Sequence, residues 1–324
     1  MASIRKVRGK WYAEVRIKGR YASKIFPSKM EAKSWSLEKE HEFGRSETVV
    51  RGKTLGDAFK RYAREISPEK KGSRWETIRL EKFGRDEIAD KLLTLLNLDD
   101  IECWIKRSSE TLAPGSVRRE MTLLKSVCAQ CIRWKWLPKN PCHGVRLPPP
   151  PPGRDRRISN EEVEKILTHL DFSIEKKVSK LKHEVAVAFL IALETAMRKG
   201  ELWSLTWEDV YLERRFVHLP VTKNGSKRDV PLSARAIELF RLLGPDNDGC
   251  VFKGSKASSD PIFRRAVKKA GIENLTFHDS RHEALTRLSK KIDVLDLARM
   301  VGHKDLKSLM IYYNATAEEI ARLL

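Results

Sequence analysis

Residues 148–157 read Pro-Pro-Pro-Pro-Pro-Gly-Arg-Asp-Arg-Arg, and this stretch decides how the chain is divided. Consecutive prolines favour the extended polyproline II helix, which rises about 3.1 Å per residue, so the run forms a stiff strap of roughly 15 Å. A strap of this kind separates folding units. The stretch therefore predicts a proline-rich basic linker over 148–157, with separate domains before and after it.

The charge of the chain is strongly unbalanced. Its 324 residues include 64 Lys and Arg against 44 Asp and Glu, which gives a formal net charge of +20. Nucleic acid is the polyanion that best explains such an excess, because phosphate contacts dominate its binding and need basic side chains. We therefore expect a nucleic-acid partner.

The apolar and cysteine content argues against a membrane or secreted protein. The longest apolar run, 185–193, has nine residues, less than half of the about 20 that a spanning helix needs. The basic N-terminus lacks the apolar run of a signal peptide. Five cysteines, an odd number, favour a reducing compartment over a disulfide framework. A cytoplasmic location without a membrane partner is expected.

Two of these cysteines raise the question of a metal site. Cys128 and Cys131 form a C-x-x-C, and Cys142-His143 follows, a combination that zinc sites also use. However, the pair lies in a segment of helical periodicity, where residues three apart point to one buried face. We favour a position in the core and expect neither a metal nor a cofactor.

Residues 1–46 predict a small basic domain. The first 27 residues hold eight basic side chains and the single acid Glu14. Alternating patterns predict three strands, over residues 3–7, 10–17 and 21–26. Ser28 followed by Glu31 is the signature of a capped helix, which would cover one face of the sheet. The other face would be basic, and it could lie in a DNA groove or simply be solvated. Its candidate DNA-binding residues are Arg5, Lys10, Arg16, Lys18 and Arg20.

Residues 47–147 predict an all-α bundle with basic outer faces. One helix is expected to begin at Thr54, with Asp57 as its third-position acid. Another is expected to be capped by Ser116, with an apolar inner face of Val117, Met121, Leu124 and Cys128. The candidate DNA-binding residues of this bundle are Arg118, Arg119 and Lys125, and those of the linker are Arg154, Arg156 and Arg157. The alternative for the linker is a plain spacer.

Residues 158–324 predict a mainly helical domain that includes one hairpin. Ser159 and Glu162 form a capping box, and the apolar run 185–193 predicts a buried helix. Residues 216–231 predict a β-hairpin, because Asn-Gly at its centre is the strongest short-range turn signal. Helices are expected to resume at about Pro261. The fold class is thus multidomain α+β: a small sheet with a helix, a helical bundle, and a mainly α domain with a small hairpin.

The same C-terminal region holds an ordered set of residues that suit phosphate chemistry: Arg198, Lys223, His278, Arg281, His303 and Tyr312. Each has an ordinary explanation when taken alone, such as an arginine at a helix end or a solvated hairpin lysine. The order of all six along the chain says more about function than any one of them does. Two guanidiniums are shaped to hold the nonbridging oxygens of a phosphodiester, and an electropositive site of this kind activates a tyrosine, whose ordinary pKa is near 10.

This order resembles the tyrosine recombinases. The strings T-A-M-R-K-G-E-L, T-K-N-G-S-K-R-D-V-P-L, F-H-D-S-R-H and V-G-H-K-D-L match their boxes almost continuously over about residues 155–324. Tyr312 follows His303 by nine residues, which is the family spacing. The chain departs from the family at Ala196, where glycine is frequent, and at Ser280, where leucine is frequent. Upstream, the layout is similar to lambda-type phage integrases, with an arm-type DNA-binding domain at 1–46 and a core-binding domain at 47–147.

The resemblance implies a site-specific integrase that cuts DNA through a 3′-phosphotyrosyl bond at Tyr312 and needs no ATP. Arg198 and Arg281 would clamp the phosphate, and Lys223 would protonate the departing 5′ oxygen. His278 would act as acid and base for the tyrosine proton, and His303 would hydrogen-bond the phosphate. The expected partners are core-type and arm-type attachment sites, a homotetramer on DNA, a DNA-bending host factor and an excision factor.

Three other functions remain open from the sequence. A type IB topoisomerase shares the chemistry without recombining partners, although the arm-like domain argues against it. A metal-dependent nuclease could use His278, His282 and His303 as ligands, but no carboxylate cluster accompanies them. A DNA-binding regulator with an inactive catalytic fold is the third possibility.

Overall fold

The computed structural model describes residues 2–17, 19–44, 52–220, 227–244, 249–303, 305–313 and 321. The chain forms two compact units, 1–152 and 153–324, and the boundary between them falls inside the predicted linker. Each unit has its own buried core. Among the described helices, none is long and apolar enough to cross a membrane.

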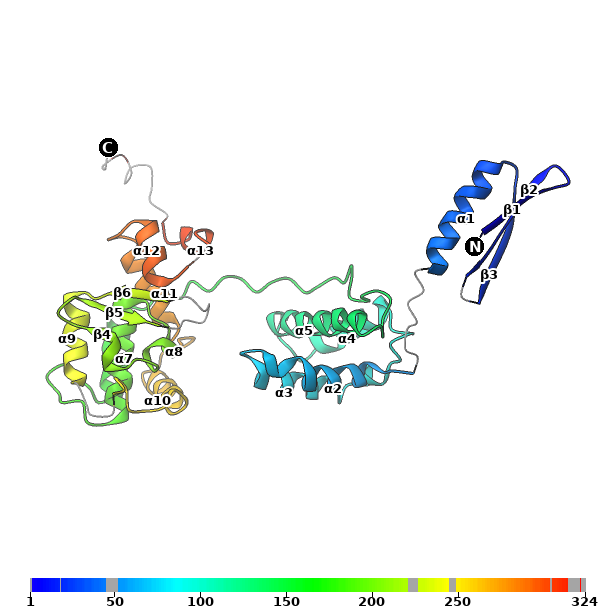
Figure 1. Ribbon diagram of the computed structural model, residues 1–324. Coiled ribbons are helices and arrows are strands. Elements are labelled where there is room, and N and C mark those ends of the chain that lie inside the picture. The colour runs from blue at the N-terminus through cyan, green and yellow to red at the C-terminus, as the bar shows by residue number, and fades with distance from the viewer. Residues whose placement is uncertain are drawn as a thin grey trace. The chain divides into compact units, whose positions relative to one another are not determined.

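The first unit begins with a three-stranded antiparallel sheet and a helix. Its elements are β1 (Ala2–Val7), β2 (Lys10–Ile17), β3 (Arg20–Phe26) and α1 (Lys29–Gly44). Helix α1 lies along one face of the sheet (Figure 1), where Ala13 and Val15 are fully buried. The Ser28 hydroxyl accepts a hydrogen bond from the Glu31 N–H, so the predicted strands and the predicted cap are confirmed.

The rest of this unit is a helical bundle. Its elements are α2 (Leu55–Glu65), α3 (Ser73–Phe83), α4 (Leu98–Ser109), α5 (Pro114–Arg133) and the 3-10 helices Ser67–Glu69 and Glu87–Asp90. The capping box of Thr54 and Asp57 is confirmed. The prediction that Ser116 caps a helix is wrong, because α5 begins two residues earlier with Pro114 in its first turn. Proline suits that position, since its fixed φ is helical and no N–H is needed there.

The cysteines of this bundle belong to its core. Cys128 and Cys131 are fully buried on the inner face of α5, beside Val117, Met121 and Leu124. The Cys142 sulfur lies 3.9 Å from that of Cys128. Burial raises the pKa of Cys131 to about 12. The predicted core position is confirmed, and the described residues hold no group of three metal-ligating side chains.

The second unit is built around the buried helix α7. Its helices are α6 (Asn160–His169), α7 (Leu181–Thr195), α8 (Lys199–Leu202), α9 (Ala234–Leu243), α10 (Lys256–Lys269), α11 (Asp279–Leu288), α12 (Val294–Val301), α13 (Lys307–Met310) and the 3-10 helix Trp207–Asp209. Helix α7 packs against α9, α10 and α11 (Figure 1), as its continuous apolar sequence requires. Helix α10 begins five residues before the predicted start, because Pro261 lies inside this helix rather than at its first turn.

A small sheet accompanies these helices. Strands β5 (Phe216–Leu219) and β6 (Arg228–Pro231) pair in antiparallel register, which confirms the strands of the predicted hairpin. Its Asn224-Gly225 turn lies outside the described residues. A third strand, β4 (Val210–Tyr211), pairs with β5 and was not predicted, because two residues carry too little pattern.

The arginines of the linker, which follow the prolines, are anchored within the second unit. Arg154 donates to both carboxylate oxygens of Asp279, one of them at 2.6 Å, and Asp279 is fully buried. Arg157 makes the same two-pronged contact with the buried Glu283, at 2.7 and 3.1 Å. Arg156 instead pairs with the half-buried Glu162 of α6. In two of the three ion pairs, the acid is therefore a buried residue of α11.

We predict that Arg154→Ala destabilises the second unit by about 1–2 kcal/mol at neutral pH, because it leaves a buried carboxylate with fewer donors. Burial opposes ionisation of Asp279, but hydrogen bonds from Arg154 and Thr276 outweigh it and lower its pKa. The stabilisation is thus present above the ordinary carboxyl pKa and is lost as the pH falls through the lower folded value. Urea unfolding at several pH values measures this.

Arg156→Ala is the matched control, since Glu162 keeps contact with solvent. It should cost less than about 1 kcal/mol. An equal loss in the two variants, or a loss in Arg154→Ala that persists at acid pH, would contradict the assignment.

Candidate active site

Arg198 lies where α7 ends and α8 begins. Helix α7 is closed by Ala196 in the left-handed conformation, with φ 54°, and Arg198 is the N-cap of α8. Glycine adopts a positive φ at least cost, which is the physical reason for glycine at position 196 in the resembled family. In this chain alanine adopts that conformation.

The buried acid Glu201 orients Arg198. Its carboxylate accepts a hydrogen bond from Arg198 Nη1 at 2.9 Å and from the Arg198 N–H at 2.8 Å. It also accepts two from Arg228, at 3.1 and 2.8 Å. Burial opposes the charge of Glu201, but the hydrogen bonds from Arg228 and Arg198 outweigh it and lower its pKa. One carboxylate thus holds two guanidiniums, and Arg228 also donates to the carbonyl of Met300.

Arg281 is the most deeply buried cation of the site, at 4% exposure. It lies in the first turn of α11 and donates to the carbonyl oxygens of Ala196 and Val301. Burial and, to a lesser degree, the charge of Arg198 lower its pKa to about 9. Arg281 and Arg198 are therefore close enough to repel, which is the arrangement that an anion between them would stabilise.

His303 contacts Arg281 as a neutral ring. Burial and the charges of Arg281, Arg198 and Arg228 lower its pKa to about 4. Its Nε2 lies 3.1 Å from Arg281 Nη2, which can only donate, so Nε2 accepts. The proton then sits on Nδ1, which donates to the Ser308 hydroxyl at 2.8 Å. In this state His303 steadies Arg281 rather than offering a donor to a ligand.

His278 is exposed at the start of α11. It lines a surface pocket together with Arg198, Lys199, Ser204 and Lys256. The pocket is therefore rich in cationic donors, which suits a phosphate oxygen.

Tyr312 is held by α11 from two sides. Its hydroxyl lies 2.8 Å from Nδ1 of His282, and its carbonyl accepts from the Ser289 hydroxyl at 2.9 Å. Burial raises the pKa of Tyr312, and Arg281 offsets part of this rise. The hydroxyl of Tyr313 is directed elsewhere and donates to the carbonyl of Ile292 at 2.9 Å.

The structure thus brings together five of the six candidate catalytic residues, and Lys223 lies outside the described residues. Sequence reasoning missed three of their partners: Glu201, Arg228 and His282. All three lie inside the strings that carry the family resemblance, so the signal was present without a role attached to it.

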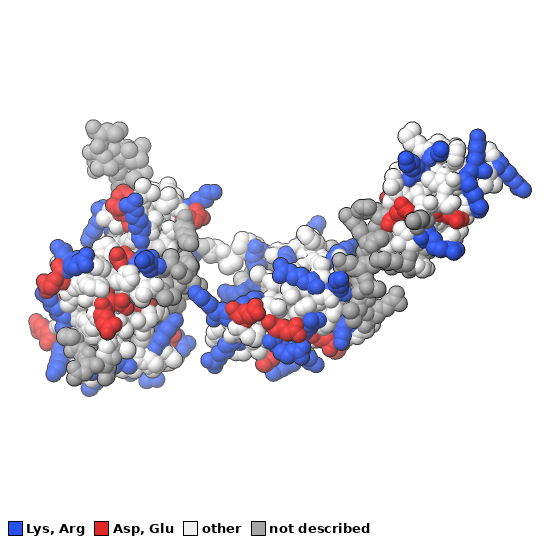
Figure 2. Space-filling view, viewed as in Figure 1, with Lys and Arg blue, Asp and Glu red and all other residues white. Residues whose placement is uncertain are grey.

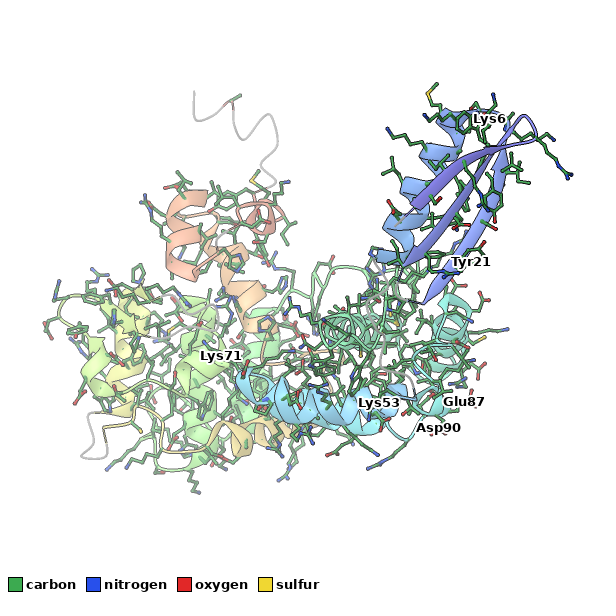
Figure 3. All side chains as sticks on the ribbon, turned by 45° about the vertical axis from the view of Figure 1, so that its right-hand side comes forward. Lys6, Tyr21, Lys53, Lys71, Glu87 and Asp90 are labelled. Atoms are coloured by element: carbon green, nitrogen blue, oxygen red, sulfur yellow. The ribbon has the colours of Figure 1, made fainter. Side chains whose placement is uncertain are left out.

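The open face of the N-terminal sheet carries arginine and tyrosine. Arg5 lies over the ring of Tyr12 and Arg16 over that of Tyr21, with 5.1 and 5.5 Å to the ring centroids. The two tyrosine hydroxyls are 3.1 Å apart. Figure 2 shows basic side chains projecting from this part of the chain, and Figure 3 shows Tyr21 on the sheet. Lys10 is exposed, whereas Lys18 and the side chain of Arg20 lie outside the described residues.

The basic residues of the helical bundle differ in their surroundings. Arg119 is exposed on α5, whereas Arg118 is half-buried and donates to the carbonyl of Pro148 at 2.7 Å. Lys125 is half-buried on the same helix. Figure 3 places Lys53 near the acidic Glu87 and Asp90, so this end of the bundle has mixed charge. Contact of these residues and of the strap arginines with DNA stays a prediction.

Comparisons with known proteins identify the family to which this chain is similar. The model of the phage integrase family matches residues 156–319. A Haemophilus influenzae protein described as an integrase/recombinase is 37% identical, over 90% of this chain and 96% of its own. The shufflon-specific DNA recombinase of Escherichia coli is 32% identical, over 84% of this chain and 71% of its own.

A solved structure extends the likeness to the whole fold. A lambda integrase dimer bound to a core site has a TM-score of 0.66 and 16% identity, over 97% of this chain and 94% of that one. At that identity the match shows the fold alone. The family model and the sequence relatives establish that the chain belongs to the phage integrase family of tyrosine recombinases, which are site-specific DNA strand-breaking and rejoining enzymes.

Proposed function

We propose that this recombinase integrates and excises a phage or other mobile element by cutting and rejoining attachment sites through a 3′-phosphotyrosyl bond at Tyr312. The observation that carries the proposal is the Tyr312 hydroxyl, which is held against α11 beside the buried Arg281. A phosphodiester placed there would meet the guanidiniums of Arg281 and Arg198. Its bond energy is kept in the tyrosyl linkage, so rejoining needs no nucleotide cofactor.

The positive charge of the site is arranged before DNA binds. Arg198 is fixed by Glu201, and Arg281 by two backbone carbonyls. Fixed donors stabilise the charge that develops on the phosphate without reorganising during the reaction. His278 lines the neighbouring pocket and would donate to a phosphate oxygen. Lys223 would protonate the departing 5′ oxygen.

His303 would take two roles in turn. Its Nε2 now accepts from Arg281, so a hydrogen bond to the phosphate requires the proton to move from Nδ1 to Nε2. Ser308 now accepts from Nδ1 and donates to the Asp305 carbonyl, so in the other tautomer its hydroxyl would turn from Asp305 to donate to Nδ1.

The proposed partners follow from this function. Core-type DNA would be held by the helical bundle and the catalytic unit, and arm-type DNA by the sheet of residues 1–46. A homotetramer would exchange the strands, as the lambda integrase tetramer bound to a Holliday junction illustrates for that protein. A host DNA-bending factor and an excision factor would set whether integration or excision takes place. Such a reaction belongs to the cytoplasm of a bacterial host.

Substitution of the adjacent tyrosines tests the nucleophile. Tyr312→Phe removes only the attacking oxygen, so it should bind DNA normally and form no covalent adduct. Tyr313→Phe loses a hydrogen bond to Ile292 and should still form the adduct. A substrate nicked beside the scissile bond traps the product for electrophoresis. An adduct in both variants would refute a nucleophilic role for Tyr312.

Charge-conserving substitutions test whether Arg198 and Arg281 hold the phosphate. Arg198→Lys and Arg281→Lys should each slow cleavage by at least about 100-fold, because lysine cannot reproduce a planar fork of donors. Arg281→Lys has a further defect, since one ammonium cannot reach Ala196, Val301 and His303 together. Arg235→Lys, on the surface of α9, is the control. A cleavage rate near that of the parent in either test variant removes that arginine from the clamp.

The salt dependence of DNA binding tests whether the open face of the N-terminal sheet contacts DNA. Arg5→Ala with Arg16→Ala should weaken binding to arm-type duplex and reduce the slope of log affinity against log salt by about 2, since each phosphate contact contributes about 0.9. Glu14→Gln removes an acid on the same face and should tighten binding. Unchanged slopes in fluorescence anisotropy titrations of both variants would assign DNA binding to another surface.

A further inference from the structure

His282 contacts the proposed nucleophile directly. Its Nδ1 lies 2.8 Å from the Tyr312 hydroxyl, and the two rings lie with their centroids 5.6 Å apart. The backbone of Tyr312 is fixed independently, because its carbonyl accepts from Ser289 at the end of the same helix. The first turn of α11 thus contacts the Tyr312 hydroxyl, and the other end of the same helix holds the Tyr312 backbone.

The surroundings keep both partners neutral. Burial lowers the pKa of His282, and the charges of Arg154 and Arg281 lower it further against the opposing charge of Asp279. Burial raises the pKa of Tyr312. At neutral pH the ring therefore has a free lone pair on one nitrogen and the phenol keeps its proton. With the lone pair on Nδ1, the hydroxyl donates to His282 along the observed contact.

We propose that His282 is the general base that accepts the Tyr312 proton during strand cleavage. As the phenolic oxygen bonds to phosphorus, its proton moves to Nδ1, and the bond from phosphorus to the 5′ oxygen breaks. The leaving oxygen takes its proton from a separate acid, for which Lys223 is the candidate. In rejoining, the 5′ hydroxyl returns its proton to that acid as it attacks phosphorus. The bond from phosphorus to the Tyr312 oxygen breaks, and the imidazolium of His282 returns its proton to the phenolate. This assignment rests on Tyr312 being the nucleophile.

The geometry favours His282 over His278 for this role. His278 lies four residues earlier, is exposed, and lines the pocket with Arg198 and Lys256. That position suits the phosphate oxygens. His282 is the described hydrogen-bond partner of the attacking oxygen, and a general base has to lie within hydrogen-bond reach of the proton that it removes. The transfer of the tyrosine proton, which the family resemblance implied for His278, is thus assigned to His282, and His278 is left beside the phosphate oxygens.

Two substitutions separate proton transfer from orientation. His282→Ala removes both functions and should slow cleavage of a nicked substrate by about 100-fold or more. In His282→Asn, the side-chain oxygen can replace Nδ1 as a hydrogen-bond acceptor but cannot take a proton. It should therefore remain within a few-fold of His282→Ala. Near-parental cleavage by either variant overturns the proposal, and recovery in His282→Asn alone would reduce His282 to a positioning residue.

A substrate with sulfur in place of the scissile 5′ oxygen shows whether His282 acts on the nucleophile or on the leaving group. A thiolate leaves without a proton, so the sulfur should rescue Lys223→Ala if that lysine is the general acid. His282→Ala should stay about 100-fold slower than the parent on this substrate. Rescue of His282→Ala to the parental rate would show that it serves the leaving group, and it would overturn the proposal.

Controls distinguish the possible failures. His169→Ala removes an exposed histidine at the end of α6 and should cleave normally. Parental DNA affinity and unfolding temperature in His282→Asn ensure that a slow rate reports chemistry. Adduct formation by Tyr312→Phe would reject the nucleophile itself. An inactive Tyr312→Phe beside a fully active His282→Ala rejects only the base.

Discussion

A buried guanidinium bonded to the ends of two helices is the constraint on which the catalytic unit depends. Arg281 is 4% exposed, and a charge at that depth costs several kcal/mol of desolvation unless its N–H groups are bonded. Ala196 and Val301 supply the carbonyl oxygens, where α7 and α12 end. Helix C-termini carry partial negative charge, which favours a cation there. Helix α7 therefore has to meet the consecutive helices α11 and α12, which follow much later in the sequence, at one side chain.

Backbone conformation makes those carbonyls available. Both helices stop at a residue in the left-handed conformation, Ala196 with φ 54° and Gly302 with φ 68°. Such a residue ends the helix and leaves its last carbonyls free for other donors. At position 302 a side chain would also crowd Arg228, whose Cδ would lie 3.1 Å from an added Cβ. Glycine is thus favoured at position 302 by contact as well as by conformation, whereas Ala196 carries only the conformational cost of about 1 kcal/mol.

Local signals in the sequence were predictive, and distant pairings were not. The capping boxes at Thr54 and Ser159 involve residues three apart, so the sequence contains the whole interaction. The candidate catalytic residues could be selected from the sequence because their types and order are specific. In contrast, Arg154 and its partner Asp279 are separated by 125 residues, and no periodicity links them. His282 was visible only as a potential metal ligand, since its role depends on where the fold brings Tyr312.

Helix α11 joins the strap to the reaction centre. Asp279 and Glu283 are four residues apart, so they share one face of the helix, and the strap arginines cover that face. Arg281 and His282 lie on the same turns and contact His303 and Tyr312, respectively. A displaced strap would leave two buried carboxylates without these donors and disturb the turn that carries both residues. The arginines of the linker are therefore part of the folded second unit as well as of a connection between domains.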